Sequence, residues 1–154
     1  MTVIMTSYRK EAMLQIRSGA RQRLGEAANA VRNAALETLT GDRHGRLYLK
    51  PGSSKKYIRG GKALSLKNFY RASAPGEAPA EATGMLRQNV HTSIDMSELS
   101  AQVGIPEHTD TGTSLEYGVH LEYGTSRMKA RPWLRPSFEK SLAQIKEILG
   151  RPWV

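Results

Sequence analysis

Apolar side chains recur at spacings of three and four residues through the first quarter of the chain. They are Met13, Ile16, Ala20, Leu24, Ala27, Val31, Ala35 and Leu39. This spacing places them along one side of an α-helix. It predicts a helix over 8–39, with Ser7 as its N-cap and Gly41 as its stop. Because Gly19 and Gly25 lower the helix propensity, we expect a break or bend near them.

The pattern changes from helical to alternating after residue 41. Segments 46–50 and 55–59 alternate apolar and basic residues, as half-buried strands do, and the proline, glycine and serines between them predict a hairpin. Residues 64–73 are a third candidate strand. Segment 73–84 contains two prolines and is expected to be an extended loop.

Short elements are predicted in the middle of the chain. Residues 85–90 follow Thr83, a helix-capping residue type, and form a helical turn. Segments 91–96 and 100–105 are two short strands around a polar turn. Residues 106–113 form a loop.

Two helices are predicted near the end of the chain. Thr113 and Glu116 fit a capping box that opens a short helix, and Gly124 ends it. Segment 126–136 is expected to be extended, with Pro136 in the first turn of the last helix. The apolar stripe of that helix is expected to be Phe138, Leu142, Ile145 and Leu149.

The order of the elements predicts an α+β fold in one domain, 1–154. A long N-terminal helix and a C-terminal helix are expected to pack on one face of a small antiparallel sheet. Residues 46–82 are the extended basic hairpin and proline-rich loop, expected to order against a neighbour. No apolar run approaches the roughly 18 residues of a membrane span, so an integral membrane protein is excluded. The absence of cysteine excludes disulfide scaffolds and thiolate zinc sites.

The net charge of +9 is concentrated in one segment. Residues 41–71 contain nine basic residues and one acidic residue, and such a field attracts polyanions or acidic protein surfaces. Aromatic residues interleave with these basic residues, a combination that could track a phosphate backbone and stack bases. A solvated basic loop is the other interpretation. The candidate residues of an assembly arm or a DNA-facing arm are Arg46, Lys50, Lys55, Lys56, Arg59 and Lys62.

Motifs that support catalysis are missing. The histidines form no metal-binding motif, and His120 with Glu116 would supply at most two ligands. The chain has no GxSxG elbow, no GxGxxG loop and no Walker loop. We therefore expect no enzyme activity, no catalytic residues, no cofactor and no metal.

Residues 117–137 read YGVHLEYGTSRMKARPWLRPS and resemble the signature of a minor tail protein family of tailed phages and prophages with long non-contractile tails. Residues 73–90, a proline-rich loop followed by Thr-Gly-x-Leu, are also similar to a stretch of that family. Gly118 and Ser137 depart from it, because alanine and a small apolar residue are common there. The matching residues, which the resemblance implies are a subunit interface, are Tyr117, Glu122, Tyr123, Gly124, Thr125, Met128, Arg131, Pro132, Trp133, Leu134, Arg135 and Pro136.

This resemblance implies a non-enzymatic virion protein of the head–tail connector, the neck or the tail-completion ring. Such a protein would assemble in the bacterial host cytoplasm as a homo-oligomeric ring, a hexamer by analogy with tail symmetry. Its partners would be itself, head-completion or connector proteins, tail tube or tail terminator proteins, and the genomic DNA that passes through the channel. It would lie in the virion and contact no membrane. The alternative is a basic DNA-binding protein that uses residues 46–71.

The residue types of the motif fit an interface or a core. Trp and Arg are enriched at binding hot spots, and Arg131 and Arg135 flank Trp133 and Leu134. Trp133 and Leu134 could instead plug this domain's own core under the last helix. Glu122 could pair with either arginine, within the chain or across a subunit boundary.

Overall fold

The computed structural model describes residues 8–52, 69–106 and 115–152. The predicted α+β fold with long N-terminal and C-terminal helices is confirmed, and the antiparallel strands form two small sheets. The elements in chain order are α1 (Arg9–Thr40), β1 (Leu47–Leu49), β2 (Phe69–Arg71), α2 (Met85–Gln88), β3 (His91–Asp95), β4 (Ser100–Gly104), α3 (Leu115–Tyr123) and α4 (Leu134–Gly150).

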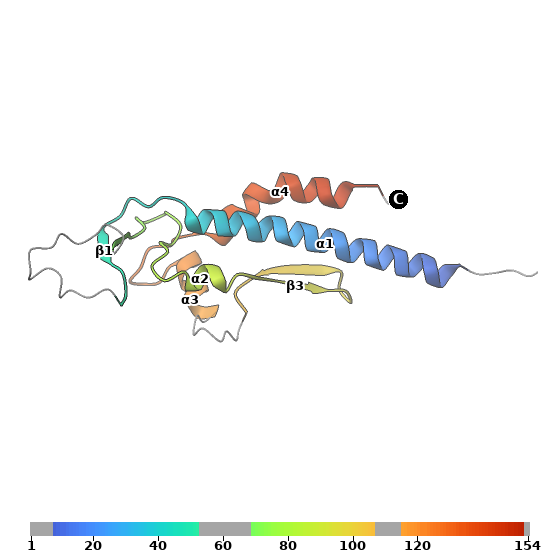
Figure 1. Ribbon diagram of the computed structural model, residues 1–154, viewed down its shortest axis with the longest axis horizontal. Helices are drawn as coiled ribbons and strands as arrows, with labels where there is room; N and C mark the ends of the chain where they lie inside the picture. Colours follow the sequence, from blue (N-terminus) through green and yellow to red (C-terminus); the bar gives the residue numbers. More distant parts are fainter. Residues whose placement is uncertain (1–7, 53–68, 107–114, 153–154) are drawn as a thin grey trace, which may run out of the picture.

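Helix α1 is the central element of the fold. Figure 1 shows α4 along one side of α1 and the β3–β4 hairpin along the other, and the N-terminal end of α1 projects beyond both. The helix runs unbroken from Arg9 to Thr40 and is followed by Gly41, so its predicted range is confirmed and the expected break is not found. At Gly25 a Cβ atom would lie 3.4 Å from Cδ1 of Ile94, which is an ordinary van der Waals contact. Ser7, the predicted N-cap, lies outside the described residues.

A basic side chain beyond the helix stabilises the C-terminal end of α1. The last turn of α1 contains no basic residue, and its carbonyl groups carry the negative end of the helix dipole. Nη2 of Arg43 donates to the carbonyl oxygens of Thr38 at 2.7 Å and Leu39 at 3.1 Å. The same guanidinium reaches the carbonyl of Pro79 at 2.9 Å, so Arg43 also fixes the proline-rich loop against the end of the helix.

The two sheets each contain one antiparallel pair. The predicted strands 91–96 and 100–105 are confirmed as β3 and β4, with His91 opposite Gly104. Strand β1 pairs with β2, which lies within the third candidate strand, so that Leu47 is opposite Arg71. The predicted hairpin partner of β1, residues 55–59, lies outside the described residues.

The apolar stripe predicted for α4 is only partly buried: Leu142 and Ile145 are half-buried, and Ile145 packs against the cluster between α1 and α4. Phe138 and Leu149 are each 47% exposed, whereas Ser137, Ser141 and Ile148 are buried. The small serines let α4 approach α1 closely, and the hydroxyl of Ser137 lies 3.3 Å from the carbonyl oxygen of Ala34. This contact rotates the larger apolar side chains onto the flank of α4. The helix also begins at Leu134, so the last residues of the segment predicted to be extended are helical.

The core lies under the C-terminal half of α1. Its main cluster brings together residues from α1, from the loops beside the strands, from α3 and from the start of α4. A second, smaller cluster joins α1 and α4 through Ala27, Ala30 and Ile148. The members of the main cluster are Ala35, Leu39, Val90, Ile105, Leu121 and Trp133.

Candidate assembly surface

A tight turn connects α3 to α4 and contains the centre of the motif at 117–136. Gly124 ends α3 with a φ of +79°, and a Cβ atom there would lie 2.8 Å from the backbone nitrogen of Ala130. Glycine is therefore required on both conformational and steric grounds. The amide of Thr125 donates to the carbonyl of Met128 at 2.8 Å, and its hydroxyl oxygen accepts from the amide of Met128 at 3.1 Å. Thr113 of the predicted capping box lies outside the described residues.

Glu122 joins the two helices on either side of this turn. Its Oε2 accepts from the amides of Trp133 at 2.8 Å and Leu134 at 3.0 Å, and its Oε1 accepts from the amide of Arg135 at 2.9 Å. These amides lie at the N-terminal end of α4 and have no acceptor within the helix. The Glu122 carboxylate, from α3, therefore caps α4. The structure shows no Glu122 ion pair with Arg135, whose Nε lies 3.2 Å from Glu139.

Trp133 lies in the core of its own chain. It is 2% exposed and packs in the main cluster, and Leu134 is partly buried against the same cluster. Trp133 and Leu134 therefore pack in the core of their own chain, as the second of the two interpretations predicted. Gly118 is one of the two positions at which the motif differs from the phage family that it resembles. It is buried, and a Cβ atom there would lie 2.5 Å from Cδ1 of Ile105.

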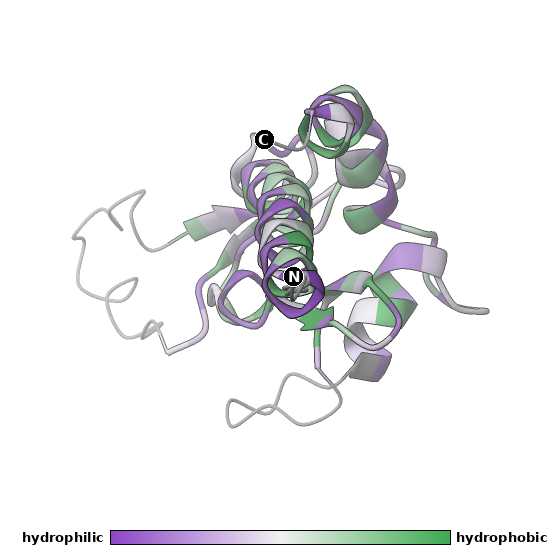
Figure 2. Ribbon diagram, turned by 90° about the vertical axis from the view of Figure 1, so that its right-hand side faces the viewer, coloured by the Kyte–Doolittle hydropathy of each residue, from purple (hydrophilic) through white to green (hydrophobic). Residues whose placement is uncertain are grey.

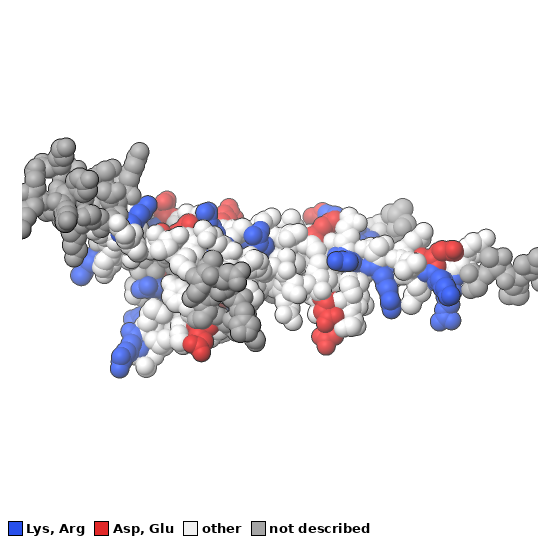
Figure 3. All heavy atoms as spheres, turned by 60° about the horizontal axis from the view of Figure 1, so that its bottom comes forward, with Lys and Arg blue, Asp and Glu red and all other residues white. Residues whose placement is uncertain are grey.

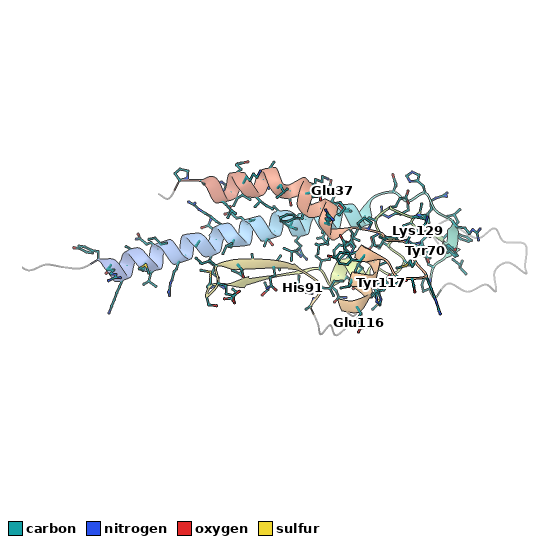
Figure 4. All side chains as sticks on the ribbon, turned by 180° about the vertical axis from the view of Figure 1, so that it is seen from behind. Glu37, Tyr70, His91, Glu116, Tyr117 and Lys129 are labelled. Atoms are coloured by element: carbon teal, nitrogen blue, oxygen red, sulfur yellow. The ribbon has the colours of Figure 1, made fainter. Side chains whose placement is uncertain are left out.

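Other motif residues lie on the surface. Tyr123 is 77% exposed and Tyr117 is 50% exposed. Thr125, Arg135 and Pro136 are also exposed, while the turn residues Gly124, Met128, Arg131 and Pro132 are partly buried. Figure 4 shows Glu116, on α3, pointing away from α1. The motif therefore combines an internal connection with an exposed aromatic surface.

An apolar groove, which we call the α4 groove, opens beside this aromatic surface. It has a volume of about 480 Å³. In Figure 2, which looks along α1, α4 and the layer formed by the hairpin and α3 diverge on one side of α1. Helix α1 forms the floor of the groove, α4 one wall, and β4 with the end of α3 the other. The apolar side chains that line it include Leu24, Val31, Val103, Tyr123, Leu134, Phe138, Ile145 and Leu149.

A second hollow of about 610 Å³ continues this surface across the hairpin. It shares Val103, Tyr123 and Leu134 with the α4 groove and is also lined by Val119. Val119 is 43% exposed, so the apolar surface extends around both sides of Tyr123.

A second apolar surface lies at the projecting end of α1. Residues 8–18, which we call the bare end, are all exposed. They include Met13, Leu14 and Ile16, with exposed fractions of 48%, 67% and 53%. Sequence periodicity placed Met13 and Ile16 on the apolar stripe but did not show that they lack a cover. The unequal lengths of the two helices could have indicated this exposure, because α1 has 32 residues and α4, which packs along it, has only 17.

The described part of the basic segment forms the β1–β2 pair. Arg46 and Lys50 flank β1 and are exposed. The rings of Tyr48 and Tyr70 lie opposite each other on the two strands, with centroids 6.0 Å apart. Lys55, Lys56, Arg59 and Lys62 lie outside the described residues.

A carboxylate ties the start of this segment to the proline-rich loop. Oε2 of Glu77 accepts from the amides of Ala74 at 2.8 Å and His44 at 3.1 Å. Oε1 of Glu77 lies 2.7 Å from Nδ1 of His44. These hydrogen bonds, the one from Ala74 first, lower the pKa of Glu77 to about 2. Glu77 is therefore an anion that orders the loop at ordinary pH.

The residues that the structure describes contain no cluster of metal-ligand side chains and no membrane-spanning helix. Within them, no three histidine or acidic side chains are grouped as metal ligands, and no helix is long and apolar enough to cross a membrane. Comparisons with protein-family models, with curated proteins and with solved structures find no match.

Proposed function

We propose that the protein is a structural, non-enzymatic virion subunit that assembles into a ring at the phage head–tail junction. The ring would belong to the connector, the neck or the tail-completion complex and would surround the DNA channel. The observation that carries this proposal is the pair of uncovered apolar surfaces, the α4 groove and the bare end of α1. The resemblance of residues 117–136 to the minor tail protein family supplies the biological setting.

The amount of exposed apolar side chain favours assembly. Single exposed apolar residues are ordinary on a protein surface, but contiguous patches mark interaction sites. Tyr123, Phe138 and Leu149 line one groove and are 77%, 47% and 47% exposed. Met13, Leu14 and Ile16 form a second patch at the far end of the same chain. A subunit that keeps such surfaces uncovered has them available for neighbouring subunits.

A second candidate function is DNA binding through the basic segment. The paired rings of Tyr48 and Tyr70, with Arg46 and Lys50 beside them, place aromatic and basic groups on one small sheet. Aromatic rings beside cations are the residue types that stack bases and neutralise phosphates. Both activities could coexist in a protein that surrounds DNA.

Size-exclusion chromatography with light scattering, at low and high salt, tests the proposed function. We expect a discrete oligomer that resists salt, because apolar contacts bury surface without releasing counterions. A protein that stays monomeric at about 0.1 mM, where a complex of about −5.5 kcal/mol would be half formed, contradicts the proposal.

Titration with duplex DNA at the same two salt concentrations tests the alternative. A complex driven by phosphate contacts loses affinity steeply as the salt concentration rises. A monomer that binds DNA in this salt-dependent way would favour the alternative over the ring. Replacing Arg46 and Lys50 by glutamate is the matching variant, and we expect it to weaken DNA binding and leave the oligomer intact.

A further inference from the structure

We infer that the turn between α3 and α4 binds phosphate groups of the DNA backbone, with Arg131 as its principal contact. We call residues 125–131 the basic turn. This inference deepens the proposed function, on which it rests, because it names the part of the subunit that would face DNA in the channel. It also places a DNA contact in the motif at 117–136, outside the basic segment 46–71.

Arg131 differs from the other partly buried arginines that the structure describes. Arg23, Arg32 and Arg43 each donate side-chain N–H groups to backbone carbonyl oxygens. Among the described residues, no atom accepts a hydrogen bond from the guanidinium of Arg131, whose Nε is buried and whose Nη atoms are not. A partly buried cation without an acceptor lowers the stability of a fold. Its presence points to an anion that reaches the Nη edge from outside the chain.

The backbone that carries Arg131 is fixed on both sides. The amide of Arg131 donates to the carbonyl oxygen of Leu121 at 2.7 Å, at the end of α3. The carbonyl oxygen of Ala130 accepts from the amide of Gly76 at 3.2 Å, so the basic turn is also attached to the loop that follows β2. Because the turn is already ordered, binding an anion there costs little conformational entropy.

More cations surround this position. Figure 4 shows Lys129, on the basic turn, at the same end of the molecule as Tyr70 of β2. Figure 3 shows blue side chains at this end, on the left, as well as at the projecting end of α1. None of the cations on the basic turn or the β1–β2 pair forms an ion pair with a described residue. The exposed ones are Arg46, Lys50, Arg71, Arg127 and Lys129.

The carboxylates that the same segments contain have other partners. Glu122 accepts from three amides at the start of α4, and Glu77 accepts from two amides and contacts His44. The basic turn itself contains three basic residues and no acidic residue. The described part of this surface therefore keeps a positive charge that an external anion can neutralise.

DNA fits this surface better than a second copy of the chain does. Duplex DNA carries one negative charge per about 1.7 Å of its axis, so cations on two neighbouring elements can contact one row of phosphates. The planar fork of an arginine also matches the oxygens of a phosphate group. The chain has a net charge of +9, which disfavours a second copy as the source of the anion.

Titration with a labelled DNA duplex at several salt concentrations tests the inference. We expect Arg131→Met to weaken binding by about 10-fold, as the loss of a hydrogen bond to a charged group does. The slope of log affinity against log salt should become shallower by about one, because one phosphate contact is lost. Arg9→Met is the matched control and should leave the DNA affinity unchanged, because Arg9 is exposed at the opposite end of the molecule.

Stability measurements separate a binding role from a structural role. Methionine keeps most of the apolar length of the arginine side chain and removes the buried nitrogen that has no acceptor. We therefore expect the urea midpoint of Arg131→Met to be unchanged or raised. A variant that unfolds at a clearly lower urea concentration would make Arg131 a structural residue and overturn the inference.

The outcomes also separate the inference from the proposed function. An oligomer that binds no DNA at low salt, or that binds it equally well with Arg131→Met, would overturn the inference and leave the ring. Loss of the oligomer in Arg131→Met would place Arg131 at a subunit interface and overturn the phosphate contact. Equal affinity for poly-L-glutamate would favour an acidic protein partner over DNA. A monomer with DNA binding that depends on Arg131 would support the phosphate contact and contradict the ring.

Discussion

The two halves of α1 carry the same apolar stripe but have different surroundings. In the C-terminal half, Ala27, Val31, Ala35 and Leu39 are buried beneath α4, the hairpin and the loops. In the N-terminal part, Met13 and Ile16 continue the stripe and remain about half exposed. The periodicity of a helix therefore shows which side will be covered but does not show whether the cover comes from the same chain.

The largest effect is expected in the covered half. Trp133→Ala removes the largest side chain of the main cluster, which is 2% exposed. We expect the free energy of unfolding to fall by about 3–5 kcal/mol, as is typical when a buried aromatic side chain is truncated. Urea denaturation monitored by circular dichroism measures the change. A loss below about 1 kcal/mol would mean that Trp133 is not a core residue.

A smaller loss of stability is expected at the start of α4, where Glu122 caps the helix. Glu122→Ala leaves the first amides of α4 without their carboxylate acceptor. We expect a loss of about 2 kcal/mol, at the upper end of helix-cap effects, because three amides are affected. Glu116→Ala, at an exposed position on the same helix, should stay within about 0.5 kcal/mol. Equal losses in the two variants would rule out the capping role.

Glu77, in the proline-rich loop beyond the C-terminal end of α1, is expected to make the stability of the fold depend on pH. Because the pKa of Glu77 is lowered to about 2, its contribution is present above the ordinary pKa of a glutamate and is lost as the pH falls towards 2. Glu77→Gln removes the charge, so we expect a shallower loss of stability between about pH 4.5 and pH 2. Acid titration of the melting temperature measures it. Superimposable profiles for the two proteins would contradict this role.

The smallest effect on folding is expected at the bare end. Ile16→Ala changes a side chain with no described cover, so the free energy of unfolding of the isolated subunit should change by no more than about 0.5 kcal/mol. The measurement is urea denaturation at a concentration below that of association. A loss of several kcal/mol would show that Ile16 is covered within its own chain, and the comparison between the two halves would fail.

The sequence predicted the elements that depend on local patterns. Periodicity identified α1 and α4, alternation identified β3 and β4, and Gly124 marked the end of α3. Capping residues and glycines act within a few positions of themselves, so they can be recognised without the rest of the fold.

Features that depend on distant contacts were not predicted. The buried face of α4 was misplaced because Ser137 and Ser141 are buried on it beside Ile148, and a search for apolar residues passes over serines. The capping of α4 by Glu122 joins residues 11 to 13 positions apart through a turn, and no helical spacing shows it. The α4 groove arises from three elements packed together, so it could be found only in the folded chain.

The serine contact between α1 and α4 has a consequence for the width of the groove. The Ser137 hydroxyl contacts Ala34 and Thr38 of α1, Ser141 is buried one turn further along α4, and the groove lies along the flank of the same helix. Their small volume fixes how far α4 stands from α1, and this distance sets the width of the trough. Larger residues at these two positions would widen the groove without changing any side chain that lines it. The width of the groove is thus set by two residues that do not line it.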